Sequence, residues 1–432
     1  MTEKRRVIII GGGFGGLYAA KQLGDPSISL TLIDRRNFHL FQPLLYQVAT
    51  GWLSPADIAS PLRVVLKRQR NAQVLLAEAT DIDVANRLVI LKDGEVSYDT
   101  LIVATGARYN YFGHPQWETL APSLKTIEDA TEIRRRILFA FEAAEREPDP
   151  EHVRSWLTFV LVGGGPTGVE LAGTLGELAK DTLRQDFRHV NPAESRILLV
   201  EGADRILPTY PAELSAKATT ALARLGVTVR TGATVTDVQS DAVIIRSNEQ
   251  SEQLATHTVI WAAGVQASPL GRLLGTATGA ELDRAGRVIV APDLSIPNHP
   301  DIFVIGDLAH YRNQQGQPLP GVAPVAMQQG RYVAELIQQR LRGQTPPPFH
   351  YRDRGSMAIV GRAVAVADVR GRRFSGLLAW LAWLFIHLMN LVEFENRLLV
   401  VIQWAWNYFT RNRSARLITG EPPSSTVVSV KQ

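Results

Sequence analysis

The chain of 432 residues is long enough for two or three domains, and its 45% hydrophobic and 20% charged residues are ordinary for a globular protein. It has no cysteine, which excludes redox chemistry at a cysteine pair, cysteine persulfides, and zinc or iron–sulfur centres held by cysteine. The formal net charge is +4 and no nucleic-acid recognition motif is present, so we do not expect nucleic-acid binding. The nine histidines do not have the spacing of metal ligands, so we do not expect a metal site.

The first predicted element is a short apolar β-strand, residues 7–10, which leads into a glycine-rich turn. No signal peptide is expected, because residues 1–6 run straight into this strand. Three glycines occupy the positions of the dinucleotide-binding fingerprint: Gly11, Gly13 and Gly16. A helix that begins near Phe14 would direct its free N–H groups at a pyrophosphate. The next strand ends at Asp34, whose carboxylate can accept hydrogen bonds from ribose hydroxyls.

The same pattern returns in the middle of the chain. The apolar residues 157–162 precede a second set of fingerprint glycines: Gly163, Gly165 and Gly168. The following strand, residues 196–200, ends at Glu201. A carboxylate here would repel the 2′-phosphate of NADPH and favours NADH, while the nearby Arg205 leaves NADPH as an alternative. Two fingerprints indicate two dinucleotides on one chain, as in a protein that passes a hydride from nicotinamide to flavin.

Three further strand-and-turn motifs accompany the fingerprints. Residues 101–106 end in Ala-Thr-Gly, residues 259–264 repeat that pattern, and residues 301–307 end in Gly-Asp. In this order they resemble the flavoproteins with two dinucleotide-binding domains, the glutathione-reductase-like class. The resemblance implies an α/β fold of two Rossmann-like domains, in which Asp307 holds the ribityl or phosphate part of FAD. We expect an FAD-binding domain in two parts, residues 1–115 and 275–345, with an NADH-binding domain, residues 116–274, between them. Residues 346–432 are expected to form a C-terminal segment for membrane association and dimerisation.

The C-terminal segment changes in composition beyond residue 376. Residues 377–392 are apolar on almost every side, residues 398–409 form a second apolar stretch, and four of the eight tryptophans lie in these two stretches. Neither stretch reaches the roughly 20 residues needed to span a bilayer. From residue 346 onward, 11 Lys or Arg against five Asp or Glu give a net charge of +6. We expect two helices in the membrane interface beside anionic lipid; burial against the body or in a dimer interface is the alternative.

Four stretches together resemble the type II NADH:quinone oxidoreductases, the single-subunit, non-pumping respiratory NADH dehydrogenases: residues 41–51, 168–173, 325–330 and 416–420. The resemblance runs nearly from end to end. It implies FAD, NADH, a membrane quinone, a homodimer, and a peripheral position on the cytoplasmic face of the cell membrane. Deleting residues 377–432 should then release an active enzyme from membranes.

Two side chains are candidates for the catalytic step through this resemblance. Glu170 matches an acid near the nicotinamide and quinone pockets, with proton relay or positioning as its role; the alternative is a helix-surface carboxylate. Gln328 matches a glutamine at the quinone end of the flavin, and its alternative is a polar residue near a helix N-terminus. Members of the family often carry Ala-Gln where this chain has Ala323-Pro324, so the glutamine contact to the quinone head group is expected to be absent. The helix beginning near Pro324 would aim its N–H groups at the flavin pyrimidine edge.

The residues expected to bind FAD are Gly11, Gly13, Phe14, Gly15, Gly16, Asp34, Arg35, Gln42, Pro43, Leu44, Ala79, Ala104, Thr105, Gly106, Gly306, Asp307 and Pro324. Those expected to bind NADH are Gly163, Gly165, Pro166, Thr167, Gly168, Glu201, Ala263 and Gly264. We predict that NADH passes a hydride to FAD and that a quinone then takes two electrons and two protons, with no nucleophile or metal. The alternatives are an NAD(P)H-dependent reductase of a soluble acceptor such as ferredoxin, and an NADH-sensing interaction protein.

Overall fold

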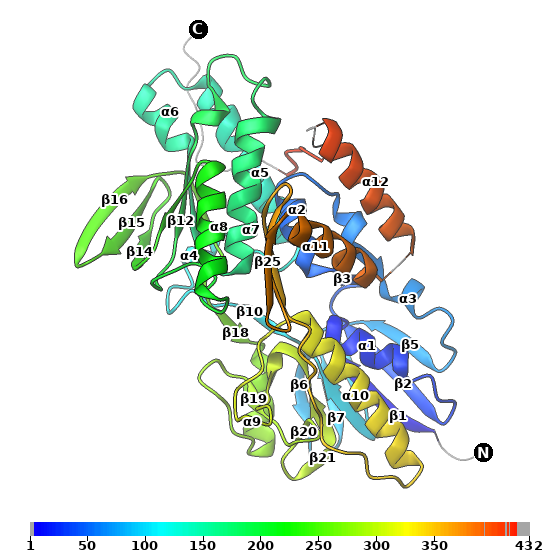
Figure 1. Ribbon diagram of the computed structural model, residues 1–432. Helices are drawn as coiled ribbons and strands as arrows, with labels where there is room; N and C mark the ends of the chain where they lie inside the picture. The colour runs from blue at the N-terminus through cyan, green and yellow to red at the C-terminus, as the bar shows by residue number, and fades with distance from the viewer. Residues whose placement is uncertain (1–3, 393, 411–412, 414, 421–432) are drawn as a thin grey trace. The chain divides into compact units, whose positions relative to one another are not determined.

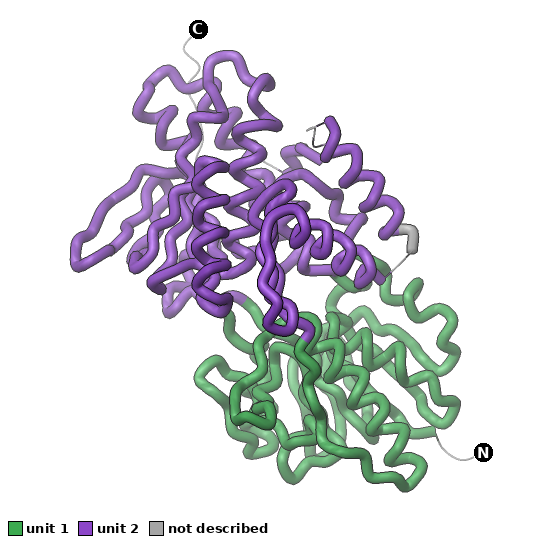
Figure 2. The backbone as a smooth tube through the Cα atoms, viewed as in Figure 1, with its two compact units in different colours: residues 1–40, 59–108, 265–353 green, residues 41–58, 109–264, 354–432 purple. Residues whose placement is uncertain are grey.

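The structure is a computed structural model (Figure 1) that describes most of the chain: residues 4–392, 394–410, 413 and 415–420. Its contacts group the chain into two compact units, which Figure 2 colours green and purple. Unit 1 is made of three stretches: residues 1–40, 59–108 and 265–353. Unit 2 is made of the three others: residues 41–58, 109–264 and 354–432. The boundaries of the ligand-binding domains given above stay a prediction.

Unit 1 is built on a six-stranded sheet in the order β20-β21-β9-β1-β2-β5. All neighbouring pairs are parallel except β20 with β21. The bounds of these strands are β1 Arg5–Ile10, β2 Ile28–Asp34, β5 Ala72–Leu76, β9 Thr100–Val103, β20 Ser295–Ile296 and β21 His299–Val304. In β1, Val7 to Ile10 are buried, as a parallel strand covered on both faces requires. The carboxyl ends of β1, β9 and β21 carry the predicted FAD-binding motifs.

Smaller elements complete unit 1. Its helices are α1 Phe14–Gln22, α3 Leu62–Val65, α9 Pro269–Thr278 and α10 Ala323–Leu341. Its other strands are β3 Phe38–Leu40, β4 Ala59–Pro61, β6 Ala79–Asp83, β7 Leu88–Leu91, β8 Gly94–Ser97, β10 Ala107–Tyr109, β18 Val265–Ala267, β19 Val288–Ile289 and β22 Ala309–His310. α1 packs closely on α10, since a Cβ at Gly330 would lie 2.2 Å from the carbonyl oxygen of Gly15.

Unit 2 contains a four-stranded parallel sheet in the order β13-β12-β11-β17 and an antiparallel sheet β14-β15-β16. The strands are β11 Thr158–Val162, β12 Arg196–Val200, β13 Val227–Arg230, β14 Ala233–Val238, β15 Ala242–Ser247, β16 Gln250–Ala255 and β17 Thr258–Trp261. The helices are α2 Leu45–Ala49, α4 Trp117–Leu120, α5 Ile127–Arg146, α6 Pro150–Trp156, α7 Pro166–Glu177 and α8 Ala212–Arg224. α7 follows β11 through the second glycine loop, so the predicted NADH site also lies at the carboxyl end of a parallel strand.

The C-terminal part of unit 2 begins with a small sheet that the sequence reasoning did not anticipate. It has the order β23-β24-β25, with bounds Ser356–Gly361, Val364–Val369 and Arg372–Gly376. β23 lies against α7 at Gly173, where a Cβ would come within 1.7 Å of the carbonyl oxygen of Val360. The apolar stretches then form α11 Leu377–Asn390 and α12 Phe394–Thr410. Within the described residues, no helix combines the length and apolarity that crossing a membrane requires.

Candidate active site

The first glycine loop joins β1 to α1 and has the conformation that a pyrophosphate site needs. Gly11 has a φ of +104°, and a Cβ there would lie 2.5 Å from the carbonyl oxygen of Ala104. A Cβ at Gly16 would lie 1.8 Å from the carbonyl oxygen of Gly11, so both positions require glycine. At Gly13, in contrast, no described atom beyond its chain neighbours lies within 4 Å of a Cβ position. The backbone at Gly13 is therefore open to a phosphate group.

The helix and the carboxylate beside this loop fit the other parts of a dinucleotide. α1 begins at Phe14; no described side chain caps it, and its first turn has no acidic residue, so its N–H groups suit an anionic pyrophosphate. Asp34 ends β2 and accepts hydrogen bonds from the backbone N–H of Gly12 at 2.6 Å and of Arg36 at 2.7 Å. These bonds fix the carboxylate beside the loop, while Arg35 is exposed.

A buried histidine that no sequence motif marks supports the same loop. His39 lies in β3 with Nδ1 2.9 Å from the carbonyl oxygen of Gly12, and its ring packs edge-on against Phe14 with 5.0 Å between centroids. Burial lowers the pKa of His39 to about 4, so the ring is neutral at pH 7. When the proton is on Nδ1, the neutral His39 ring donates a hydrogen bond to the carbonyl oxygen of Gly12. It therefore stabilises the turn without adding a positive charge to it.

More predicted FAD-binding residues follow neighbouring strands of unit 1: Ala104, Thr105 and Gly106 after β9, and Gly306 and Asp307 after β21. The Thr105 hydroxyl is buried without a hydrogen-bond partner in the part of the chain that the structure describes, which suits a group that bonds to a cofactor. The N–H of Gly306 donates to the side-chain oxygen of Gln329 at 2.7 Å, a contact that no sequence motif predicts. Ala79 begins β6.

The second glycine loop in unit 2 repeats the geometry of the first. Gly163 has a φ of +107°, and a Cβ there would lie 2.7 Å from the backbone nitrogen of Ala263. A Cβ at Gly168 would lie 1.9 Å from the carbonyl oxygen of Gly163. Gly165 again has no described atom near its Cβ position, and α7 begins at Pro166 without a side-chain cap from any described residue. The loop therefore fits a second pyrophosphate.

Glu201 holds the place that Asp34 holds in unit 1. Its carboxylate accepts hydrogen bonds from the backbone N–H of Gly164 at 2.6 Å and of Ala203 at 2.8 Å. Arg205 instead donates to the carbonyl oxygen of Pro208 at 3.1 Å. A negative group beside the ribose position thus favours NADH over NADPH.

The remaining predicted residues of unit 2 occupy short segments. Thr167 lies in the first turn of α7. Gly264 has a φ of +67° and is covered by the Phe112 ring, which would meet a Cβ at 2.5 Å. Gln42, Pro43 and Leu44 form a short 3₁₀ helix that precedes α2, and the Gln42 amide donates to the carbonyl oxygen of Lys125 at 3.5 Å. None of these contacts prevents the predicted roles.

Glu170 lies two residues beyond Gly168 near the start of α7. It accepts a long hydrogen bond, 3.5 Å, from the backbone N–H of Ile359 on β23. Burial raises the pKa of Glu170 to about 8, so the side chain is mostly a neutral carboxylic acid at pH 7. Burial raises the pKa of the Tyr210 phenol, and the negative charge of ionised Glu170 raises it further. The same two causes, in the same order of size, raise the pKa of Tyr46. A carboxylic acid held neutral in this way can donate a proton.

Gln328 and Pro324 both lie on α10. The Gln328 amide donates to the carbonyl oxygen of Arg352 and accepts from its N–H, both at 3.0 Å, so this side chain ties α10 to the chain beyond it. That pairing gives Gln328 a structural contact with Arg352, and its proposed place beside a quinone stays a prediction. Pro324 lies in the first turn of α10, whose N-terminus has no cap from the described side chains and no acidic residue. This end of α10 suits negative charge.

Comparison with known proteins assigns the family. The model of the pyridine nucleotide-disulphide oxidoreductase family matches residues 5–330, and that of the NDH2 C-terminal domain matches residues 354–412. Two type II NADH:quinone oxidoreductases of Mycobacterium tuberculosis are each 45% identical over 97% of this chain, covering 91% and 90% of their own lengths. The chain belongs to the type II NADH:quinone oxidoreductase family. A structure of NDH2 from Plasmodium falciparum in complex with NADH, 21% identical, matches the fold over 97% of this chain and 100% of its own, with a TM-score of 0.88.

Membership in the type II NADH:quinone oxidoreductase family confirms the resemblance read from the sequence. The predicted fold class of two Rossmann-like domains with a C-terminal segment is confirmed as well. So are the enzyme class and the cofactors FAD and NADH. The individual site residues stay predictions, supported by the geometry above.

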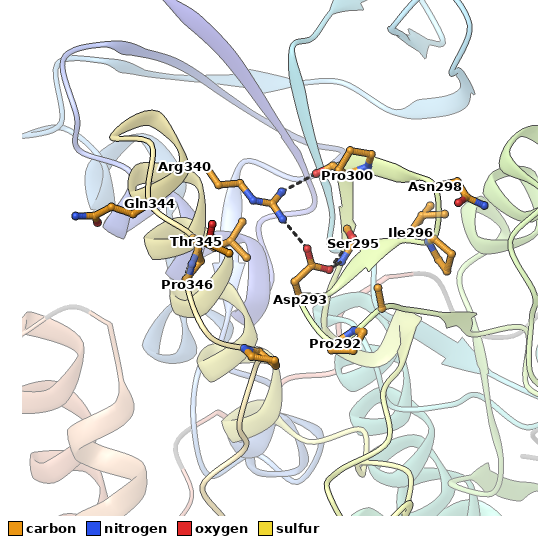
Figure 3. Close-up of a pocket in the computed structure, with 14 residues that line it drawn as sticks. Pro292, Asp293, Ser295, Ile296, Asn298, Pro300, Arg340, Gln344, Thr345 and Pro346 are labelled. Carbon is orange, nitrogen blue, oxygen red and sulfur yellow. Dashed lines mark hydrogen bonds and ion pairs between the residues drawn. The ribbon is translucent and has the colours of Figure 1, made fainter.

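One pocket of about 650 Å³ lies elsewhere in unit 1, between the C-terminal end of α10 and the turns around β20 (Figure 3). Arg340 donates across it to a carboxylate oxygen of Asp293 at 2.6 Å and to the carbonyl oxygen of Pro300 at 2.9 Å. Asp293 also accepts from the Ser295 hydroxyl at 2.6 Å. The charged groups thus partner one another, and no site residue predicted from the sequence lines the pocket, so we assign it no part in the reaction.

Proposed function

We propose that this chain oxidises NADH through FAD and passes two electrons to a quinone without pumping protons. The observation that carries the proposal is the pair of glycine loops, each open at its central glycine and each flanked by a carboxylate fixed by backbone N–H groups. FAD, when bound, supplies a two-electron carrier between nicotinamide and quinone. The absence of cysteine from the sequence is consistent with direct delivery to a diffusible acceptor.

The chain's own residues bind and orient NADH. The N-terminus of α7 attracts the pyrophosphate, and Gly165 lets it approach the backbone. Glu201 accepts hydrogen bonds from the ribose hydroxyls and repels a 2′-phosphate. The protein's contribution to electron transfer is therefore mainly orientation and electrostatics.

Glu170 is the proposed proton donor to the acceptor. Quinone reduction to quinol consumes two protons, and a carboxylic acid with a pKa near 8 is both protonated and able to release its proton near neutral pH. The N–H of Ile359 stabilises the carboxylate once the proton has left. The other hydrogen of the quinol derives from the hydride of NADH, so NADH, one proton and quinone give NAD⁺ and quinol.

NADH oxidation with a water-soluble short-chain quinone tests the reaction. We expect a loss of nicotinamide absorbance that depends on both the quinone and added FAD. NADPH is the matched control, and we expect it to be oxidised more slowly than NADH. A rate that is fast with ferredoxin and negligible with every quinone would favour the soluble-acceptor alternative. Negligible rates with all acceptors, together with an NADH-dependent change in oligomeric state, would favour the sensing role.

We further propose that the enzyme is peripheral on the cytoplasmic face of the membrane and binds anionic lipid. The two C-terminal helices expose many large apolar side chains: Leu377, Leu378, Leu381, Phe385, Ile386 and Met389 on α11, and Leu398, Leu399, Val401, Ile402, Trp406 and Phe409 on α12. The surrounding excess of basic residues suits anionic head groups. Flotation with anionic vesicles should carry the protein upward, and neutral vesicles or high salt should weaken this. Protein that remains at the bottom of the gradient with anionic vesicles would contradict the proposal.

We also propose that the protein forms a homodimer, because part of this apolar surface can be buried between two copies of the chain. Light scattering of the detergent-solubilised protein should give twice the mass of the chain. The monomer mass at micromolar concentration would refute it.

A further inference from the structure

Arg413 lies just beyond α12 and is a buried cation, with 2% of its surface exposed. It donates to the backbone carbonyl oxygens of Thr50 and Thr174, both at 3.1 Å, and to a carboxylate oxygen of Glu177 at 3.4 Å. The guanidinium also lies 4.9 Å from the centre of the Trp52 ring. A buried charge is tolerated only when it is paired and hydrogen-bonded, and Arg413 meets this requirement by joining the segment that carries α2 to α7.

Glu177 is the buried carboxyl partner of Arg413: burial raises the pKa of this carboxyl, and the charge of Arg413 opposes the rise. It is the last residue of α7, and its carboxylate also accepts from the backbone N–H of Arg362, at the turn between β23 and β24. Gly361 permits this approach, since a Cβ there would lie 2.8 Å from the carboxylate oxygen. Burial lowers the pKa of Arg413 to about 10, against the opposing effect of Glu177, so Arg413 remains a cation at pH 7.

α12 holds the same segment through its inner face. The Trp404 indole N–H donates to the side-chain oxygen of Gln47 at 2.7 Å, and the Asn407 amide donates to the carbonyl oxygen of Trp52 at 3.0 Å. The Gln47 amide in turn donates to the Tyr46 hydroxyl at 3.0 Å. Together with Arg413, the C-terminal region therefore reaches three positions between residues 47 and 52.

The packing at this joint is incomplete. A cavity of about 30 Å³ is lined by side chains of α2, α7, α11 and α12, among them Tyr46, Glu177, Trp380 and Trp404. The volume suits about one water molecule. The polar links therefore act together with the apolar packing of α2, whose residues Leu45, Tyr46 and Val48 are buried.

We propose that Arg413 is a positioning residue, which, paired with Glu177, holds residues 45–52 against α7 in the arrangement that quinone reduction requires. The inference rests on the proposed function, in which Glu170 on α7 serves the acceptor. α2 packs on α7, and Tyr46 lies within electrostatic range of Glu170. Arg413 does not touch the reacting groups; it acts through Thr50, whose hydroxyl donates to the carbonyl oxygen of Tyr46 at 2.9 Å. The outer face of α12 is apolar and exposed, so one helix both presents the membrane surface and fixes this segment.

The test uses full-length holoenzyme and separates the two half-reactions. Arg413→Met keeps the side-chain volume and removes the charge; Arg413→Lys keeps the charge and removes the planar fork. In Arg413→Met we expect flavin reduction by NADH within about twofold of wild type, and reoxidation by a short-chain quinone at least about tenfold slower. Hydrogen–deuterium exchange should rise in residues 45–52, and Arg413→Lys should recover part of both effects.

Two further variants keep the test decisive. Val366→Ala removes buried methyl groups from β24 and serves as a control for lost stability alone. If Arg413→Met does not fold, the double variant Glu177→Met with Arg413→Met removes both charges, and its reoxidation should still be slow.

Three results would overturn the inference: reoxidation of the variants at the wild-type rate, an equal loss in Val366→Ala at matched melting temperature, or an equal slowing of both half-reactions. Wild-type protein that reduces its flavin with NADH but passes nothing to quinone would instead defeat the proposed function, and this inference with it.

Discussion

Replacing Glu170 with glutamine tests the proton-donor role, because glutamine keeps the size of the side chain and an oxygen for the Ile359 N–H while it removes the titrating proton. With a pKa of about 8, the acid form outnumbers the carboxylate about ten to one at pH 7, and the ratio is reversed at pH 9. The rate of flavin reoxidation by quinone should therefore fall about tenfold between pH 7 and pH 9 in the wild type, since the proton-bearing form is lost as the pH rises through 8.

In Glu170→Gln the rate should be lower by about 100-fold, the usual contribution of a positioned acid, and nearly independent of pH over the same range. Stopped-flow absorbance of the flavin, after reduction by one equivalent of NADH, measures the rate. Glu213→Gln, an exposed residue on α8, is the matched control and should keep the wild-type profile. A Glu170→Gln enzyme with the wild-type rate and pH dependence would exclude Glu170 as the proton donor.

Three other predictions concern Glu201, Gly173 and Phe385. Glu201→Ala should raise the preference for NADPH over NADH by about tenfold, measured as a ratio of kcat/KM values, since it removes the carboxylate that repels a 2′-phosphate; an unchanged ratio would contradict this. Gly173→Ala should destabilise unit 2 by about 1–3 kcal/mol through its collision with the Val360 carbonyl, whereas the open Gly24→Ala should leave the melting temperature nearly unchanged. Phe385→Glu on the exposed face of α11 should weaken flotation with anionic vesicles, and full retention would count against that face as the membrane surface.

The dinucleotide loops were predictable because their physical requirements are local. Gly11 and Gly163 need left-handed backbone, and each is followed within five residues by a glycine that must lie against the loop's own carbonyl. Asp34 ends β2 and Glu201 directly follows β12, and parallel pairing of each strand with the strand before the loop brings the carboxylate to the loop. The spacing of these residues in the sequence was therefore enough to predict the geometry of both loops.

The C-terminal joint was not predictable, because its contacts connect residues far apart in the chain. Arg413 meets its partners 236 to 363 residues away, and no periodicity or motif marks such a pairing. The sheet formed by β23, β24 and β25 was not predicted, because no fingerprint motif marks its strands. Deleting residues 377–432 removes Trp404 and Arg413, so the proposed role of Arg413 predicts a released enzyme that loses quinone reduction, whereas the sequence alone predicts an active one.

Anaerobic double-mixing is the most direct test of the central claim, that electrons pass from NADH through FAD to a quinone. Purified protein is mixed with NADH, the flavin absorbance is followed, and a short-chain quinone is then added. We expect fast bleaching of the flavin with NADH and fast recovery with quinone. Bleaching without recovery would contradict the quinone half, and bleaching with NADPH but not NADH would contradict the role given to Glu201.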